Sequence, residues 1–226
     1  LKSNPTSVTF LWMGKGDNNH QSTIYAEVDM ADVEVHDCGP GRLALFTKRS
    51  PAKETTNEDA AAFYVMDDDR AVLSVADGMG GKPVGEQASQ LALKQVHTAL
   101  DELKEQELEL RYGILNGFEN ANQAVQDLGV GAGTTLVVAE VDNRTLRPYH
   151  AGDSLTLVVS QRGKIKLQTV AHSHVGYAVE AGILDEREAM FHEDRHLVLN
   201  CLGAADMRVE IGSMTRLAPR DTVLLA

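Results

Sequence analysis

Cysteine is scarce in this chain of 226 residues, and its scarcity argues against two kinds of small stabilised domain. The two cysteines, Cys38 and Cys201, lie far apart and form no Cys-x-x-Cys pair. The sequence therefore indicates neither a disulfide framework nor a zinc knuckle. A reducing compartment, the cytoplasm, fits this cysteine usage best.

Basic residues are also few. There are 21 Lys and Arg against 33 Asp and Glu, which gives a formal net charge of −12. Proteins that bind a phosphate backbone usually present a concentrated basic face, so we expect no nucleic-acid partner. An acidic surplus mostly reflects a solvated surface, but it can include carboxylates that a divalent cation brings together.

Long apolar runs are lacking as well. No stretch approaches the roughly 20 residues that span a bilayer, and the apolar part of the N-terminal segment is too short for a signal peptide. We therefore expect a soluble, cytoplasmic protein with no membrane partner. With 43% hydrophobic residues, the chain can bury one sizeable core.

The order of the hydrophobic patterns predicts an α+β fold. Residues 1–40 are interpreted as an irregular accessory N-terminal extension, and regular patterns begin after it. Two amphipathic helices are predicted at Val84–Leu103 and Leu110–Leu128, because apolar residues recur there every three to five positions. Strand candidates precede the helices, and consecutive hairpins follow them. This order favours antiparallel sheets with segregated helices.

The stretch VLSVADGMGG, residues 72–81, ends an apolar strand on Asp77 and continues with three glycines. A strand end holds a carboxylate firmly, and glycines let main chain approach whatever it binds. An Asp-Gly turn before a helix is the alternative interpretation. The stretch lacks the Gly-x-Gly-x-x-Gly spacing, and Pro83 stands where a P-loop needs Ser or Thr, so neither nucleotide-binding motif is present.

Three further carboxylates lie at the boundaries of predicted strands. Glu58 and Asp59 directly precede one strand, and Asp153 lies between two others. Each alone is typical of a turn or a cap. Together with Asp77 they fit Mg²⁺ or Mn²⁺, which prefer oxygen ligands and need no Cys or His.

Four stretches resemble, in order, the motifs of the protein phosphatase 2C family, the metal-dependent Ser/Thr phosphatases, in its bacterial form. They are NEDA at 57–60, VADGMGG at 75–81, GAGTTLVVAEV at 131–141 and HAGDS at 150–154. The segment from AHSHVG to LNCLG, residues 171–203, is similar to the family's mobile flap. The resemblance extends from Leu43 to Ala226.

This resemblance implies a four-layer α-β-β-α sandwich of two antiparallel sheets flanked by helices. Residues 41–226 would form the catalytic domain, lacking its C-terminal end. The implied site holds two, or with a looser ion three, Mn²⁺ or Mg²⁺ ions at the edge of the sheets. A water or hydroxide shared by two cations would attack a phosphorylated serine or threonine of a protein substrate.

The resemblance also implies roles for individual residues. Asp77 would bridge the two metals, and Gly78 would offer its carbonyl oxygen to one of them. Glu58 would hold that metal directly or through water, with Asp59 supporting the network as a third catalytic residue. Asp153 would help to bind the looser ion.

Three departures from the family pattern affect these expectations. Glu54 stands where the family has a phosphate-binding arginine, so Arg49 or Lys53 is the candidate for that role. Ala171 replaces the usual Asp before the flap histidine, His172. The chain ends before the Ser-Asp-Gly and Asp-Asn motifs that carry further metal ligands, which favours a natural protein with additional C-terminal sequence.

Two other functions stay open on the sequence alone. One is a phosphatase-like binding or regulatory module that has lost full metal ligation. The other is a zinc peptidase, because HEDRH at His192–His196 satisfies His-Glu-x-x-His, with Glu193 as the base. No third zinc ligand is evident, and charged residues lie inside that motif.

Overall fold

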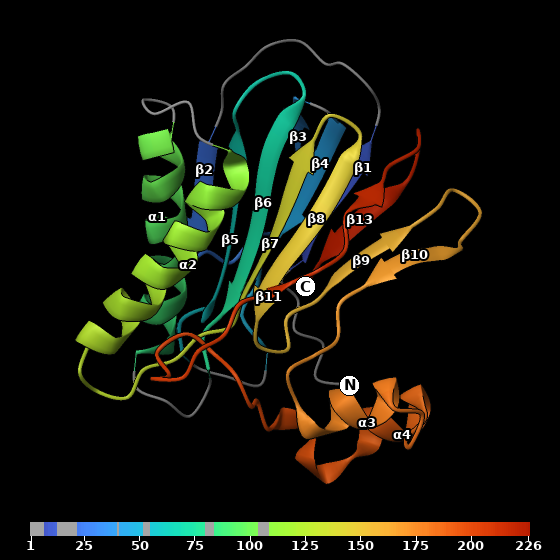
Figure 1. Ribbon diagram of the computed structural model, residues 1–226. Helices are drawn as coiled ribbons and strands as arrows, with labels where there is room; N and C mark the ends of the chain where they lie inside the picture. Colours follow the sequence, from blue (N-terminus) through green and yellow to red (C-terminus); the bar gives the residue numbers. More distant parts are fainter. Residues whose placement is uncertain (1–6, 13–21, 40, 52–54, 80–83, 104–108) are drawn as a thin grey trace.

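The computed structural model describes residues 7–12, 22–39, 41–51, 55–79, 84–103 and 109–226, and for 7–12 it describes the backbone. Two antiparallel sheets pack face to face, and a pair of long helices covers one of them (Figure 1). This arrangement confirms the predicted α+β class.

The first sheet has the strand order β10-β9-β13-β1-β4-β3. Its strands are β1 (Ser7–Trp12), β3 (Glu34–Cys38), β4 (Gly41–Phe46), β9 (Thr156–Val159), β10 (Ile165–Gln168) and β13 (Thr222–Leu225). The second sheet has the order β11-β8-β7-β6-β5-β2, with β12 also paired to β8. Its strands are β2 (Ser22–Ala26), β5 (Asp59–Val65), β6 (Arg70–Asp77), β7 (Leu136–Asp142), β8 (Thr145–Ala151), β11 (Glu210–Ile211) and β12 (Thr215–Arg216).

Strand β5 shows why the sandwich forms, because every one of its residues is buried. Side chains of a strand alternate between its two faces. Ala61 and Phe63 join the core between the two sheets, whereas Ala62 and Tyr64 join the core beneath the helices. A strand buried on both faces needs apolar residues at nearly every position, and DAAAFYV supplies them.

The two long helices are α1 (Gly85–Leu103) and α2 (Leu110–Asp127), within one residue of the predicted bounds. They pack against each other and against the outer face of the second sheet, where their apolar stripes are buried (Figure 1). Among the described residues, the remaining helices are short and form no corresponding layer on the first sheet. Neither long helix is apolar enough to cross a membrane, and the described residues contain no other helix that could.

The described part of residues 1–40 is integral to the sandwich rather than accessory to it. Strand β1 lies between β13 and β4 in the first sheet, β3 pairs with β4, and β2 forms the edge of the second sheet beside β5. A boundary at residue 40 would therefore cut through both sheets. Polar stretches separate these strands in the sequence, so no single segment shows which sheet each of them joins.

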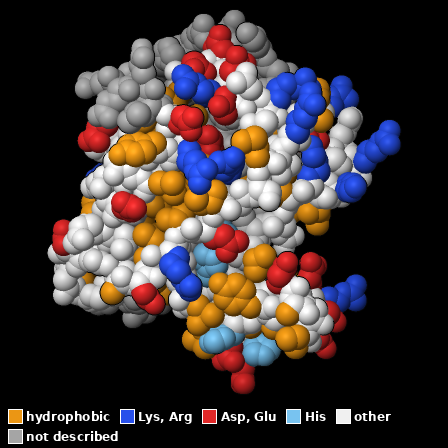
Figure 2. All heavy atoms as spheres, viewed as in Figure 1, with side chains coloured by type: hydrophobic (Ala, Val, Ile, Leu, Met, Phe, Trp, Pro, Cys, Tyr) orange, Lys and Arg blue, Asp and Glu red, His pale blue; other side chains and the backbone are white. Residues whose placement is uncertain are grey.

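Residues 171–200, called the flap below, form a small lobe at one end of the sandwich (Figure 1). The flap contains α3 (His174–Glu180), α4 (Glu186–Phe191) and the 3-10 helix η1 (Glu193–His196). Hydrophobic side chains gather on its surface (Figure 2), and Ile183 and Phe191 are each 80% exposed. Cys38 and Cys201 are both buried.

Candidate active site

The strand register brings Asp59 and Asp77 together at one end of the β5–β6 hairpin, where they are directly paired. Residues 61 and 63 of β5 and residues 73 and 75 of β6 all face the core between the sheets. Alternation along each strand places Asp59 and Asp77 on the same face, at the end of that core. Two carboxylates directly opposite one another repel, and a cation bound at this end would offset the repulsion.

Glu58 and Gly78 are fixed by contacts of their main chain. The Gly78 N–H donates to the carbonyl oxygen of Glu58 at 3.0 Å, and the Ser89 hydroxyl of α1 donates to the same oxygen at 2.7 Å. A Cβ at position 78 would lie 2.3 Å from the carbonyl oxygen of Gly85 and 2.7 Å from that of Glu58. Glycine is therefore required here by close packing of main chain. Gly80 and Gly81 lie outside the described residues.

Thr135 joins Asp77 to the turn that carries Asp153. Its hydroxyl oxygen accepts the Asp77 N–H at 3.0 Å and lies 2.7 Å from the hydroxyl oxygen of Ser154. The Thr135 N–H donates to the Asp77 carbonyl at 2.9 Å, as does the Thr134 hydroxyl. The sequence identifies the Gly-Thr-Thr stretch as a motif without giving Thr135 a role, because the partners of a hydroxyl depend on the fold.

Asp153 occupies a partly buried position beside the flap. Burial raises the pKa of its carboxyl above the ordinary value, while a backbone hydrogen bond and the nearby His196 and His172 lower it in part. A bound cation would favour the charged form of such a carboxyl. The contacts of Thr135 with Asp77 and with Ser154 bring the turn of Asp153 to the same edge as Asp77. Carboxylate and carbonyl oxygens are the donors that a hard divalent cation prefers.

Arg49 pairs with an acidic residue rather than standing free. The main-chain N–H of Arg49 donates to Asp29 Oδ1 at 2.7 Å, and the Arg49 side-chain Nε lies 3.1 Å from Asp29 Oδ2. The segment around Arg49 lies close to Glu58, because the side-chain amide of Asn57, the residue before Glu58, donates to the Thr47 hydroxyl at 2.8 Å. Lys53, the other candidate for binding phosphate, lies outside the described residues, as does Glu54.

The His-Glu-x-x-His stretch does not adopt the geometry that a zinc peptidase needs. The motif requires both histidines on one face of an α-helix. Here His192 precedes a 3-10 helix as its N-cap, with an extended backbone at φ −63° and ψ 139°, and its Nδ1 accepts the Asp194 N–H. His196 lies within electrostatic reach of Asp153. This segment therefore gives no support to the peptidase interpretation.

A cluster of polar side chains that sequence reasoning did not identify, three of them buried and Glu210 exposed, contacts Gly152, the residue before Asp153. The rings of His150 and His172 stack with centroids 4.3 Å apart, and His172 Nε2 lies 3.0 Å from Glu210 Oε2. Asn200 donates from Nδ2 to His172 Nδ1 at 2.8 Å. These four residues, called the histidine network below, come from β8, β11 and the two ends of the flap. His150 and His172 lie in separate matched stretches and Glu210 lies in none, so the sequence carries no local signal for their meeting.

Comparison with known proteins agrees with this geometry. The family model described as Protein phosphatase 2C matches residues 49–201, which include Glu58, Asp77 and Asp153. The chain belongs to the protein phosphatase 2C family. The family assignment confirms the resemblance found in the motifs.

Two bacterial relatives show how far the similarity extends. Protein phosphatase PhpP of Streptococcus pneumoniae is 33% identical over 162 residues, covering 68% of this chain and 65% of PhpP. The serine/threonine phosphatase stp of Listeria welshimeri is 30% identical over 183 residues, covering 75% of this chain and 70% of stp. The chain thus spans slightly less than two thirds of the length of PhpP.

Solved structures show the same fold. A serine/threonine phosphatase of Streptococcus agalactiae is 24% identical with a TM-score of 0.65, covering 90% of this chain and 78% of that one. The PPM Ser-Thr phosphatase MsPP of Mycobacterium smegmatis, solved in complex with cacodylate, is 25% identical with a TM-score of 0.64. Its similarity covers 88% of this chain and 78% of MsPP.

Proposed function

We propose that this chain is a metal-dependent protein serine/threonine phosphatase with its active site at the ends of β5, β6 and β8. The observation that carries the proposal is the pairing of Asp59 with Asp77 at the end of the inter-sheet core. Thr135 extends this arrangement by contacting both Asp77 and Ser154, the neighbour of Asp153. Membership of the protein phosphatase 2C family supports the same activity.

The oxygen donors define which cofactor the site would hold. Asp77 would be shared by two Mn²⁺ or Mg²⁺ ions, with Glu58 and the Gly78 carbonyl on one of them and Asp153 toward a looser third. When bound, the ions would supply an acidic water for in-line attack on a phosphate monoester and would offset charge on the phosphoryl oxygens. Either of these two ions would accept the proposed oxygen donors.

The chain's own residues supply rigidity. Thr134 and Thr135 hold the main chain of Asp77 through three hydrogen bonds of 2.9–3.0 Å. The backbone that bears the Asp77 carboxylate is therefore fixed. Asn57 fixes the preceding turn, because its Oδ1 accepts the Asp59 N–H at 3.2 Å. Preorganised ligands cost little rearrangement when a cation or phosphate binds.

The proposed substrates are proteins that carry phosphoserine or phosphothreonine, as the names of the relatives suggest. Arg49 would bind phosphate only by exchanging Asp29 for it, because both groups compete for the same guanidinium. Lys53 is the second candidate. The cytoplasmic location and the absence of nucleic-acid and membrane partners stay predictions from the sequence.

The test is hydrolysis of a phosphothreonine peptide and of p-nitrophenyl phosphate, with Mn²⁺ added and with Mn²⁺ chelated. We expect activity that needs the metal and that falls by at least about a hundredfold in Asp77→Asn. Asp37→Asn, at an exposed position on β3, is the matched control and should keep full activity. Equal activity in Asp77→Asn and the wild type would remove Asp77 from the site.

Ala171, which stands where the family has Asp before the flap histidine, favours a second candidate, a binding module that retains the fold without turnover. Such a module would bind the phosphopeptide with measurable affinity and release no phosphate at any Mn²⁺ concentration. A binding titration run beside the hydrolysis assay separates the two functions.

A further inference from the structure

His172 holds both polar groups of the Gly152 main chain. The main-chain N–H of His172 donates to the Gly152 carbonyl at 3.0 Å, and the ring Nδ1 of His172 accepts the Gly152 N–H at 3.1 Å. Gly152 has a φ of 120°, and a Cβ there would lie 2.6 Å from the Cβ of Thr135. The residue before Asp153 is therefore confined between His172 on one side and Thr135 on the other.

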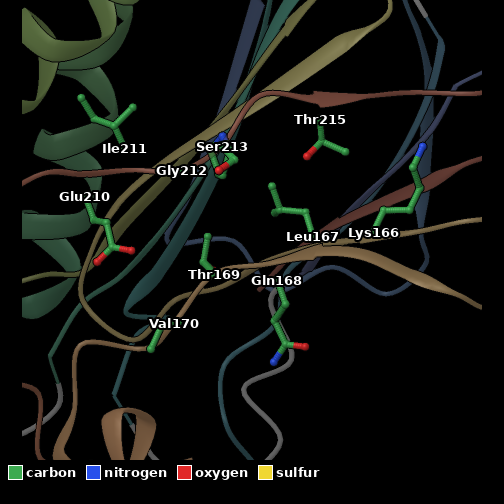
Figure 3. A pocket seen from close by; sticks show the side chains of 11 residues that line it. Lys166, Leu167, Gln168, Thr169, Val170, Glu210, Ile211, Gly212, Ser213 and Thr215 are labelled. Carbon is green, nitrogen blue, oxygen red and sulfur yellow. The ribbon is translucent and has the colours of Figure 1, made fainter. Parts of the chain in front are cut away.

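The ring of His172 is itself held from several directions and is only 3% exposed as a residue. His150 stacks on it with an interplanar angle of 19°, and Glu210 Oε2 lies 3.0 Å from its Nε2. Glu210 is the direct strand partner of His150 and lines one end of a cavity of about 400 Å³ (Figure 3). The carboxylate can therefore stay partly hydrated while it holds the ring.

The hydrogen bonds define which ring nitrogen carries the proton. Asn200 is oriented by Arg208, whose N–H donates to Asn200 Oδ1 and whose carbonyl accepts from Asn200 Nδ2. Nδ1 of His172 thus faces two donors, the Asn200 amide and the Gly152 N–H. It must accept, so the proton is on Nε2 and is donated to Glu210.

The same histidine anchors the base of the flap. The Leu199 N–H donates to the His172 carbonyl at 2.8 Å, and the next residue, Ser173, forms a bridge with Val198. The segments by which the flap leaves and rejoins the sandwich therefore meet at His172. One side chain connects this meeting point to the turn of Asp153.

A metal held directly by the network is a weaker interpretation, although His150, His172 and Glu210 offer ligand atoms within 4.8 Å of one another. A metal on His172 Nε2 would displace its proton while Nδ1 still faces two donors. Lone pairs of imidazole nitrogens lie in the ring plane, and nearly parallel stacked rings cannot direct two of them at one ion between them. The network is better suited to holding main chain.

We propose that His172 is a positioning residue that sets the Asp153 carboxylate for cation binding and links it to the base of the flap. The inference rests on the proposed function, in which Asp153 is a metal ligand. Residues that orient a metal ligand typically change metal affinity by about 10- to 100-fold when they are replaced.

The test is Mn²⁺ binding by the protein, measured from the electron paramagnetic resonance signal of free Mn²⁺, with no turnover required. In His172→Asn, Oδ1 stands near the place of Nδ1 and can accept the Gly152 N–H. In His172→Gln, the amide reaches the place of Nε2 and Glu210 instead, and the acceptor for Gly152 is lost. We expect His172→Gln to weaken the loosest Mn²⁺ site at least about tenfold and His172→Asn to keep it within about threefold of the wild type.

The reverse order would overturn the proposal, because glutamine is nearer to histidine in volume and would be the milder change if His172 only filled space. If His172→Gln fails to fold, as judged by thermal unfolding, Glu210→Ala provides the test from the edge of the network. It should weaken the same site about threefold by releasing the ring, and unchanged affinity would count against the proposal.

Asp153→Asn separates the role of Asp153 as a metal ligand from the role of His172 in positioning it. If it weakens Mn²⁺ binding while the His172 and Glu210 variants do not, the positioning role alone is wrong. If it leaves Mn²⁺ binding unchanged, Asp153 is not a ligand and the proposed metal set fails with it. Stoichiometric zinc retained by the wild type and lost in His150→Ala would also refute the positioning role.

Discussion

Gly78 gives the most exacting test of the packing around the site, because Ala at this position adds one carbon where main chain already closes the space. The new Cβ would lie 2.3 Å from the Gly85 carbonyl oxygen and 2.7 Å from that of Glu58. Either the start of α1 or the end of β6 must then move by roughly 1 Å to restore an ordinary contact. A movement of that size shifts the Gly78 carbonyl, which is a proposed metal ligand.

The expected loss of stability depends on whether the new Cβ would contact main chain or a side chain. Overpacking typically costs about 1–3 kcal/mol, and main chain yields less than a side chain, so we expect about 3 kcal/mol for Gly78→Ala. In a domain of this size each kcal/mol lowers the unfolding midpoint by about 2–4 °C, which gives a fall of about 6–12 °C. Circular dichroism melts in EDTA measure this stability without any contribution from metal.

The matched control is Gly163→Ala, in a β-turn where no atom would lie within 4 Å of the new Cβ. Its φ of 77° makes alanine strained, so it should cost about 1 kcal/mol while Mn²⁺-dependent hydrolysis stays unchanged. Gly78→Ala should in addition need a higher Mn²⁺ concentration for half-maximal activity. A midpoint within about 2 °C of the wild type, with an unaltered Mn²⁺ response, would refute the reasoning.

Three further predictions concern other parts of the chain. Thr135→Val should remove Mn²⁺-dependent hydrolysis and destabilise the fold by about 1–2 kcal/mol, because the partly buried Asp77 N–H would lose the hydroxyl that accepts it. Thr135→Ser should retain most of the activity in the same assay. Asp221→Asn should lower stability in urea unfolding by about 1–2 kcal/mol, since the buried Asp221 carboxylate lies 2.5 Å from Nζ of the more exposed Lys166. A loss below about 0.5 kcal/mol would show that this ion pair does not stabilise the fold. Burial lowers the pKa of His97, with Asp101 opposing the shift, so the unfolded chain binds more protons than the fold below about pH 6.5. Wild-type stability should therefore decline relative to His97→Phe as the pH falls from 7 to 5.5, and parallel urea titration curves at the two pH values would show that His97 stays uncoupled from folding.

The sequence predicted the long-range order of the fold where periodicity is strong. Both long helices and the hairpins β7–β8 and β9–β10 agree with their apolar spacing, because a buried stripe is visible in a single segment. The predicted run of consecutive hairpins was wrong between β8 and β9, which lie in different sheets. The strands in residues 1–40 were interpreted as accessory, since a short strand such as EVHDC has no alternation that distinguishes it from a loop. Its place beside β4 depends on pairing, which is a property of two segments.

For the site as well, features within one segment were predicted and contacts between segments were not. Motif order led to Asp77, Glu58, Asp59 and Asp153, and strand register then explains why the first three share one edge. The hydroxyl of Thr135 and the ring of His172 were not assigned roles, because their partners are main-chain groups far away in the sequence. Composition and spacing carry no information about such contacts, which exist only after the sheets have packed. The same limit applied to HEDRH, where a local pattern matched but the backbone did not form an α-helix.

The most direct test of the central claim is an anomalous difference map from crystals of the protein grown with Mn²⁺, recorded at the manganese absorption edge. The account expects peaks within about 2.0–2.3 Å of the Asp77 carboxylate and of the Gly78 carbonyl oxygen. Peaks confined to other positions, such as His150, His172 and Glu210, with none beside Asp77, would contradict it.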